Sequence, residues 1–188
     1  MAEAIDIPTD PEGFLAWEFE QAERYERLDG IVRMMVGGTN AHHLLTGNLF
    51  GDLWQRLRGS GCQPFAEAAR LVTPANDVLY PDVLVTCAPF SLEGTYLDQA
   101  VLVAEVLSAS TEGRDRGAKW RACQTVPGLA YYLLLSQEAP CLEMYHWDDG
   151  WRYACFEGLD AIPRLERWNL ELPLDRLYEG VAFTPENG

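Results

Sequence analysis

The sequence predicts a single α/β domain built on a mixed β-sheet with helices packed against it. Two continuous apolar runs, residues 80–86 (YPDVLVT) and 101–107 (VLVAEVL), have the length and composition of buried strands. A polar, charged helix candidate covers residues 111–124, and another buried strand is expected at residues 131–135. Strands interrupted in this way by a helix are typical of a mixed sheet.

The elements before these runs can be predicted in order. Residues 11–21 are compatible with a short helix, and residues 25–35 predict two strands joined at Asp29–Gly30, a dipeptide favoured in tight hairpins. Two glycines then lead to Thr39 or Asn40 as a helix N-cap. Leucines recur every four residues over residues 41–57, which predicts an amphipathic helix. A strand is expected over residues 65–72, ending at Pro74.

The C-terminal part adds smaller elements to this core. Residues 141–156 predict a β-hairpin around Asp148–Asp149–Gly150, and a short helix is expected near residues 174–178. There is no internal repeat or long linker. We therefore expect a mobile N-terminal segment over residues 1–20, which includes the short helix, and one domain over residues 21–188.

Composition limits the classes of function. The 188 residues are 48% apolar and carry a formal charge of −15, which argues against a protein that coats nucleic acid by bulk attraction. The five cysteines include no C-x-x-C pair, so we expect reduced thiols in a cytoplasmic protein. The first residues lack the features of a signal peptide, and no apolar run approaches the roughly 20 residues of a membrane span. No membrane partner is expected.

Two acids in apolar runs indicate a metal site. If the two runs are antiparallel neighbours with Thr86 opposite Val101, then Asp82 faces Glu105, with Cβ atoms roughly 4.5–5.5 Å apart. Two such charges about 4 Å apart repel by about 4 kcal/mol at an effective dielectric constant near 20. A hard cation such as Mg²⁺ removes this repulsion, and the chemistry fits phosphodiester hydrolysis. The alternative is that Asp82 lies in a Pro-Asp turn and Glu105 pairs with an arginine.

Lys119 is the only lysine of the chain and lies in its densest cationic segment, RDRGAKWR. This segment begins shortly after Glu105, so the lysine is expected near the acids. An ammonium there would orient a water or offset charge that develops on the phosphorane oxygens. The alternative is an exposed helical pair between Asp115 and Lys119, which contributes only about 0.3–0.5 kcal/mol.

Several segments together resemble a known family. They are YERLDG (25–30), HHLLTGNL (42–49), YPDVLV (80–85), AEVLSAST (104–111), RDRGAKW (114–120), GLAYYLLL (128–135) and LPLDRLYEGV (172–181). The chain resembles the PD-(D/E)XK nucleases and, within them, the Uma2 family of endonucleases. This resemblance implies a restriction-endonuclease-like fold with added β-hairpins, in which Asp82 and Glu105 hold Mg²⁺ or Mn²⁺. Leu107 stands where the superfamily expects a lysine, so the resemblance moves that catalytic role to Lys119.

The resemblance also implies roles for two residues nearer the N-terminus. Glu26 matches an early glutamate of the family, which would be a metal ligand or a water-orienting base; the alternative is a surface charge of the hairpin. His42 matches the histidine at the helix start, and a capping or packing role is its alternative. With His42, the arginines of the cationic segment are candidates for contact with nucleic acid: Arg114, Arg116 and Arg121.

The sequence therefore predicts a Mg²⁺-dependent endonuclease that acts on nucleic acid, with DNA as the expected substrate. A homodimer is compatible with this prediction, because cutting both strands often uses two sites. The alternative is a catalytically inactive nuclease-fold module that binds nucleic acid or a protein partner, favoured by the acidic charge and the missing in-strand lysine. A metal hydrolase of small phosphates is a third hypothesis.

Overall fold

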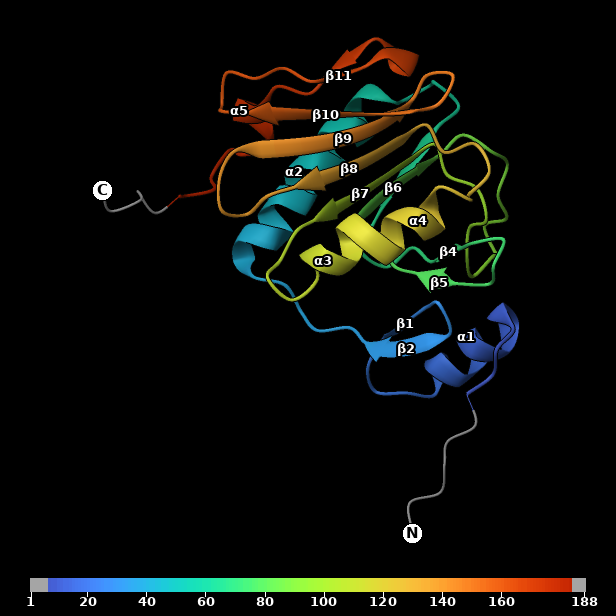
Figure 1. The fold of residues 1–188 in the computed structure, drawn as a ribbon. Coiled ribbons are helices and arrows are strands. Elements are labelled where there is room, and N and C mark those ends of the chain that lie inside the picture. The colour runs from blue at the N-terminus through green and yellow to red at the C-terminus, as the bar shows by residue number, and fades with distance from the viewer. Residues whose placement is uncertain (1–6, 184–188) are drawn as a thin grey trace.

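The computed structural model describes residues 7–183 of the chain, and a six-stranded sheet forms its centre (Figure 1). The strand order is β10-β9-β8-β7-β6-β3, and only β7 and β8 run parallel. The strands are β3 (Gln63–Ala66), β6 (Val83–Thr86), β7 (Leu102–Val106), β8 (Tyr131–Leu135), β9 (Cys141–Trp147) and β10 (Trp151–Glu157). The predicted mixed sheet is confirmed.

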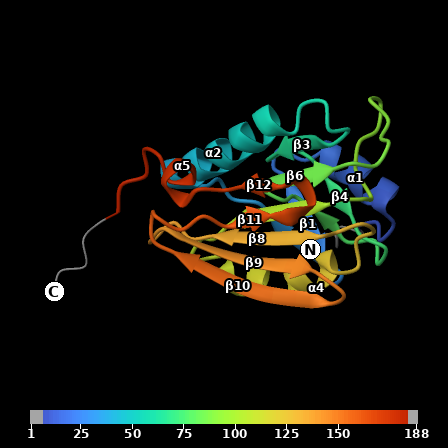
Figure 2. The same ribbon diagram turned by 90° about the horizontal axis from the view of Figure 1, so that it is seen from above.

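Helices cover both faces of this sheet (Figure 2). On one face lies α2 (Asn40–Arg56), whose buried Leu45, Leu49 and Leu53 pack on the sheet because they recur on one side of the helix. On the other face lies a continuous helical segment in which Trp120 packs against Tyr132. This segment consists of α3 (Glu112–Arg114), the π-helical turn η1 (Asp115–Lys119) and α4 (Trp120–Cys123).

A second, four-stranded sheet with the order β2-β1-β5-β4 carries the N-terminal part of the chain. Its strands are β1 (Tyr25–Leu28), β2 (Ile31–Met34), β4 (Leu71–Val72) and β5 (Val78–Leu79). The predicted hairpin is present, since Leu28 pairs with Ile31 around Asp29 and Gly30, which both have positive φ. The expected short helix is α1 (Pro11–Phe19), and its Phe14 is fully buried. Of the expected mobile start, residues 1–6 lie outside the described residues.

One predicted strand is interrupted and another is shorter than expected, because the chain passes from one sheet to the other. The strand expected over residues 65–72 divides at Glu67, whose φ of 47° ends β3, and β4 belongs to the second sheet. In the run at residues 80–86 only the part from Val83 onward is a strand, because β5 of the second sheet ends at Leu79, before the run, and β6 begins at Val83. Asp82 therefore lies just before β6 and not inside a strand.

The C-terminal part completes the fold largely as expected. The predicted hairpin is β9–β10, with Trp147 paired to Trp151 across the turn. A short two-stranded sheet follows, made of β11 (Arg164–Leu165) and β12 (Leu170–Glu171) around the 3₁₀ turn η2 (Glu166–Trp168). The expected last helix is α5 (Leu174–Leu177).

The expectation that all cysteines are reduced is wrong for two of them. Cys62 and Cys87 form a disulfide that joins the segments beside β3 and β6. These strands are antiparallel neighbours with Gln63 opposite Thr86, so Cys62, just before β3, and Cys87, just after β6, meet at the ends of the two strands. The cytoplasmic location stays a prediction. Over the described residues, no helix is both long and apolar enough to cross a membrane.

The register of β6 and β7 brings the two predicted acids together. Val83 pairs with Ala104 and Val85 with Leu102, which is the predicted antiparallel register. Continued by one residue, this register places Asp82 opposite Glu105. Because Val83 and Ala104 point toward α2, the pleat directs both acids toward the face covered by α3, η1 and α4.

Candidate active site

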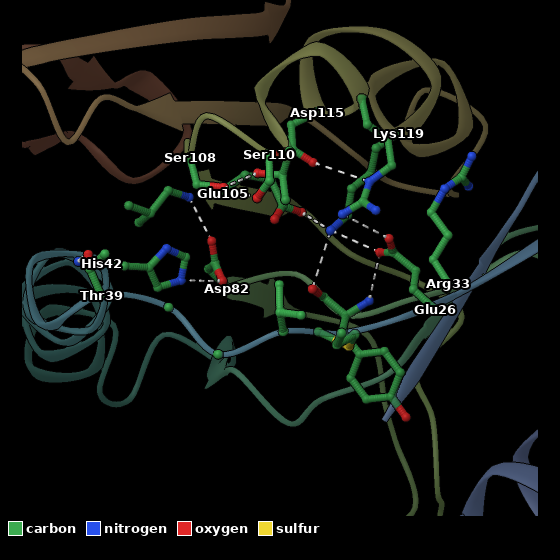
Figure 3. A pocket seen from close by; sticks show the side chains of 18 of the residues that line it. Glu26, Arg33, Thr39, His42, Asp82, Glu105, Ser108, Ser110, Asp115 and Lys119 are labelled. Carbon is green, nitrogen blue, oxygen red and sulfur yellow. Dashed lines mark hydrogen bonds and ion pairs between the residues drawn. The ribbon is translucent and has the colours of Figure 1, made fainter. Parts of the chain in front are cut away.

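The two acids line a cavity of about 430 Å³ between the two sheets and the start of α3. The β1–β2 hairpin, the loop before α2 and the end of β7 form its walls (Figure 3). Its charged residues are the carboxylates Glu26, Asp82, Glu105 and Asp115 and the cations Arg33, Arg114 and Lys119. His42 also lines it. The resemblance-based candidates Glu26, His42, Asp82, Glu105 and Lys119 thus meet in one place.

Asp82 is held by groups from two elements. Its Oδ2 accepts a 2.7 Å hydrogen bond from the backbone N–H of Val106 in β7. Its Oδ1 lies 3.0 Å from Nε2 of His42, near the start of α2. The carboxylate remains 18% exposed, so oxygen lone pairs stay accessible from the cavity.

His42 reaches Asp82 because of the way α2 begins. Thr39 is the N-cap, and its hydroxyl accepts the backbone N–H of His42. Burial opposes protonation of the imidazole, but the hydrogen bond and the negative charge of Asp82 outweigh it and raise the pKa of His42. A capping role for the His42 side chain is therefore not what the structure shows.

Lys119 lies at the centre of the buried charges. Its Nζ is 2.8 Å from Oε1 of Glu105 and 3.0 Å from Oε1 of Glu26, and it donates to the carbonyl oxygen of Tyr80 at 3.3 Å. Lys119, Glu26 and Glu105 are each less than 5% exposed. The hypotheses of an exposed Asp115–Lys119 pair and of Glu26 as a surface charge are therefore wrong.

Lys119 belongs to a π-helical turn, a rare distortion often found at functional sites. This turn buries both Asp115 and Lys119. Burial is the largest effect on Lys119 and would lower its pKa, but the surrounding carboxylates, Glu105 and Glu26 above all, raise it well above its ordinary value. The ammonium therefore stays charged.

Glu105 and Asp115 are desolvated carboxylates. Burial raises the pKa of Glu105 well above its ordinary value, and the charges of Asp82 and Asp115 add to this effect while Lys119 opposes it. Burial also raises the pKa of Asp115. Sequence reasoning did not assign Asp115 to the site; its spacing of four residues from the only lysine was the available signal.

The predicted arginines divide into two groups. Arg114 lines the cavity, with Nη2 3.4 Å from Oε2 of Glu26. Arg116 instead pairs with Glu112 and Glu143, each at 2.6 Å, and Arg121 is exposed on α4. Neither Arg116 nor Arg121 lines the cavity. The sequence analysis grouped the three arginines as candidates for contact with nucleic acid, but the helical segment places only Arg114 at the cavity.

The carboxylates fit a hard, oxygen-binding cation. Both carboxylates are buried and have spare lone pairs: Oε1 of Glu105 has the Lys119 ammonium at 2.8 Å as its ion-pair partner, and Oδ1 of Asp115 accepts no hydrogen bond among residues 7–183, with Nε of Arg114 3.9 Å away. Within the same residues, no third acid, histidine or cysteine joins Asp82 and Glu105 in a group with all ligand atoms within 4.8 Å. A site with two carboxylates and open positions for water suits Mg²⁺ better than a closed zinc cage.

Comparison with known proteins identifies the family. The family model Uma2, described as "Putative restriction endonuclease", matches residues 11–176. The chain belongs to the Uma2 family. An uncharacterized Synechocystis protein, slr1290, is 34% identical over 92% of this chain and 93% of its own length. Another from the same organism, sll1609, is 29% identical over 70% of this chain and 77% of its own.

A solved structure supports the Uma2 fold. It is the crystal structure of a "putative nuclease belonging to DUF820" from Anabaena variabilis, with a TM-score of 0.77 and 15% sequence identity, covering 93% of this chain and 100% of that one. At this identity the likeness concerns the fold, and the predicted restriction-endonuclease-like fold is confirmed. Membership in the Uma2 family supports a nuclease-like function.

Proposed function

We propose that this chain is a Mg²⁺-dependent endonuclease that hydrolyses phosphodiester bonds of nucleic acid, with DNA as its substrate. The observation that carries the proposal is the opposition of Asp82 and Glu105 beside a buried lysine in one cavity. Buried carboxylates of this kind are costly unless a cation compensates them. Mn²⁺ would serve in place of Mg²⁺, since both prefer carboxylate oxygens.

The residues of the chain would divide the work as follows. Asp82 and Glu105 hold the ion, and Glu26 assists by binding Lys119 or by orienting water. A bound divalent ion supplies positive charge next to the scissile phosphate. Lys119 keeps its proton because carboxylates surround it, so it acts as a charged donor toward the phosphate oxygens and not as a general base. His42 holds Asp82 in position.

Lys119 and Glu105 form an ion pair of 2.8 Å. A cation bound to Glu105 would compete with this contact and leave the ammonium, still held by Glu26, available to the substrate. Mg²⁺ usually keeps several of its waters, and a phosphate oxygen could replace one of them inside the 430 Å³ cavity. Arg33 and Arg114, which also line the cavity, would contact the nucleic-acid backbone.

Cleavage assays test the proposal. Purified protein incubated with duplex and single-stranded DNA and RNA in Mg²⁺ or Mn²⁺ should cut DNA, and Asp82→Asn should abolish cutting. Asp98→Asn, at an exposed carboxylate of the loop before β7, is the matched control and should cut normally. If no substrate is cut with either ion, the proposed nuclease activity is refuted.

The alternative is an inactive module that binds nucleic acid or a protein partner. It is favoured by one observation, the direct ion pair of Glu105 with Lys119, which already balances the charge of this carboxylate. Thermal unfolding separates the two, because a ligand at 100 times its dissociation constant stabilises by about 2.7 kcal/mol. An enzyme should show this gain with Mg²⁺ and lose it in Glu105→Gln, whereas the module should show a flat response. Sedimentation of the protein with and without duplex DNA would test a homodimer.

A further inference from the structure

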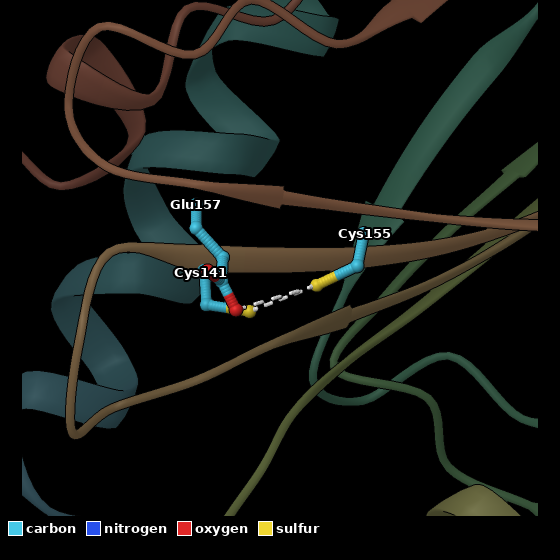
Figure 4. A group of neighbouring side chains, drawn as sticks. All are labelled: Cys141, Cys155 and Glu157. Atoms are coloured by element: carbon cyan, nitrogen blue, oxygen red, sulfur yellow. Dashed lines mark hydrogen bonds between the residues drawn. The ribbon is translucent and has the colours of Figure 1, made fainter.

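The β9–β10 hairpin carries a second group of metal-ligating side chains, outside the cavity. They are Cys141, Cys155 and Glu157 (Figure 4). The two sulfurs are 3.6 Å apart, Sγ of Cys155 lies 4.0 Å from Oε1 of Glu157, and all three ligand atoms lie within 4.8 Å of one another. None of the three lines the cavity of Asp82 and Glu105.

The strand pairing explains why these side chains converge. Cys141 lies directly opposite Glu157, and Cys155 precedes Glu157 by two residues. Residues two apart on a strand share a face, and directly opposed residues of an antiparallel pair share it too. The convergence is therefore fixed by the register of two seven-residue strands, and it does not depend on a mobile loop.

The distances suit a tetrahedral cation with sulfur ligands. A Zn–S bond of about 2.3 Å and tetrahedral angles give a sulfur–sulfur separation of about 3.8 Å, close to the 3.6 Å between Cys141 and Cys155.

We propose that Cys141, Cys155 and Glu157 form a binding site for a thiophilic divalent cation of the Zn²⁺ class, with water in the fourth position. Glu143 is not a fourth ligand, because its carboxylate is bound by Arg116 and Tyr153. The site differs in chemistry from the oxygen-rich cavity, since thiolates select Zn²⁺ and carboxylates alone select Mg²⁺. The other cysteines are unsuited, with Cys62 and Cys87 in a disulfide and Cys123 fully buried.

Cobalt titration tests this site independently of nuclease activity. Co²⁺ added to the oxygen-free, thiol-reduced protein should produce a sulfur-to-cobalt charge-transfer band that saturates at one ion per chain and disappears when Zn²⁺ is added. Carboxylates give no such band, so binding in the main cavity does not interfere. A wild-type protein without the band at saturating Co²⁺ would overturn the proposal.

Variants locate the ligands. Cys141→Ser and Cys155→Ser should lose the band, and Cys155 is exposed, so its replacement leaves the fold intact. Glu157→Gln should weaken binding by about tenfold or more, since even outer-shell partners contribute that much. Glu171→Gln, at an exposed position on β12, is the matched control and should bind normally. The double variant Cys62→Ser/Cys87→Ser should keep the band. If this variant loses the band, or if Cys155→Ser keeps it, the band comes from other thiols and the proposed site is refuted.

Discussion

The backbone N–H of Val106 donates a 2.7 Å hydrogen bond to the carboxylate of Asp82. Val106 directly follows Glu105, so this bond ties the first acid to the strand that carries the second. It forms where β6 has not yet begun, at a point where a backbone N–H of β7 would otherwise lack a strand partner. The side chain of Asp82 thus continues the ladder and fixes its own position beside Glu105.

Replacement of Asp82 should separate a structural role from a catalytic one. Asp82→Asn keeps an oxygen that can accept the Val106 N–H, whereas Asp82→Ala leaves this donor unpaired at a cost of about 1–3 kcal/mol. Urea unfolding should therefore show Asp82→Ala to be less stable than Asp82→Asn, while both lose cleavage. Equal stability of the two variants would mean that the Val106 bond contributes little.

His42 should titrate above its ordinary pKa, because Asp82 binds and stabilises the imidazolium. NMR titration measures this value, and His42→Gln identifies the signal among the three histidines. In Asp82→Asn the charge is gone while burial remains, so the pKa of His42 should fall. A pKa unchanged by Asp82→Asn would contradict the contact.

The same shift makes part of the stability dependent on pH. The pKa of His42 is raised in the folded state, so its contribution is fully present below the unfolded value of about 6.5 and is lost as pH rises through the folded value. The difference in free energy of unfolding between wild type and His42→Gln should therefore shrink as pH rises through this window. Chemical unfolding at a series of pH values measures it.

Gly38 should be required for the position of His42. A Cβ at Gly38 would lie 2.7 Å from Cγ and Cδ2 of the imidazole, whereas a Cβ at Gly37 would meet nothing within 4 Å. Gly38→Ala should thus displace the ring, lower the pKa of His42 and reduce cleavage. Gly37→Ala is the matched control in the same loop and should change neither. If both variants behave alike, crowding of His42 is not the cause.

Removal of the buried ammonium should destabilise the protein strongly. Lys119→Met leaves Glu105 buried without its cation and Glu26 with Arg114 alone, and breaking a buried pair costs roughly 3–5 kcal/mol. Mg²⁺ should restore part of this stability in urea unfolding if the carboxylates can bind it. Arg121→Met, an exposed cation on the same helical segment, should change stability by less than about 0.5 kcal/mol.

Reduction of the disulfide between Cys62 and Cys87 should also destabilise the fold. The bond closes a loop with a sequence separation of 25 residues, which contains Asp82. In the chain-entropy model a loop of this size contributes about 3–4 kcal/mol. The free energy of unfolding of Cys62→Ser/Cys87→Ser, measured with urea, should be lower than that of the wild type by this amount. Mass spectrometry after thiol alkylation should show both cysteines of the wild type unalkylated. Free thiols at both positions would contradict the disulfide.

Much of the site could be predicted because its sequence signals are local. Apolar runs with one acid each, a single lysine and the family segments were sufficient to select Asp82, Glu105 and Lys119. The register assumed from the strand ends, with Thr86 opposite Val101, agrees with the observed pairing of β6 and β7 that opposes the two acids. The family and the fold class followed from the same residues.

Other features depend on contacts between distant segments. The ion pair of Lys119 with Glu26 joins residues 93 positions apart and could not be derived from spacing. The burial of Asp115, the division of the strand runs between two sheets and the Cys62–Cys87 bond are of the same kind. Sequence patterns report which side of an element is apolar, and they determined which residues carry the chemistry. Only the packing of the hairpin, sheet and π-turn decided their partners, because the burial of a charge and the charges that surround it are properties of the assembled fold.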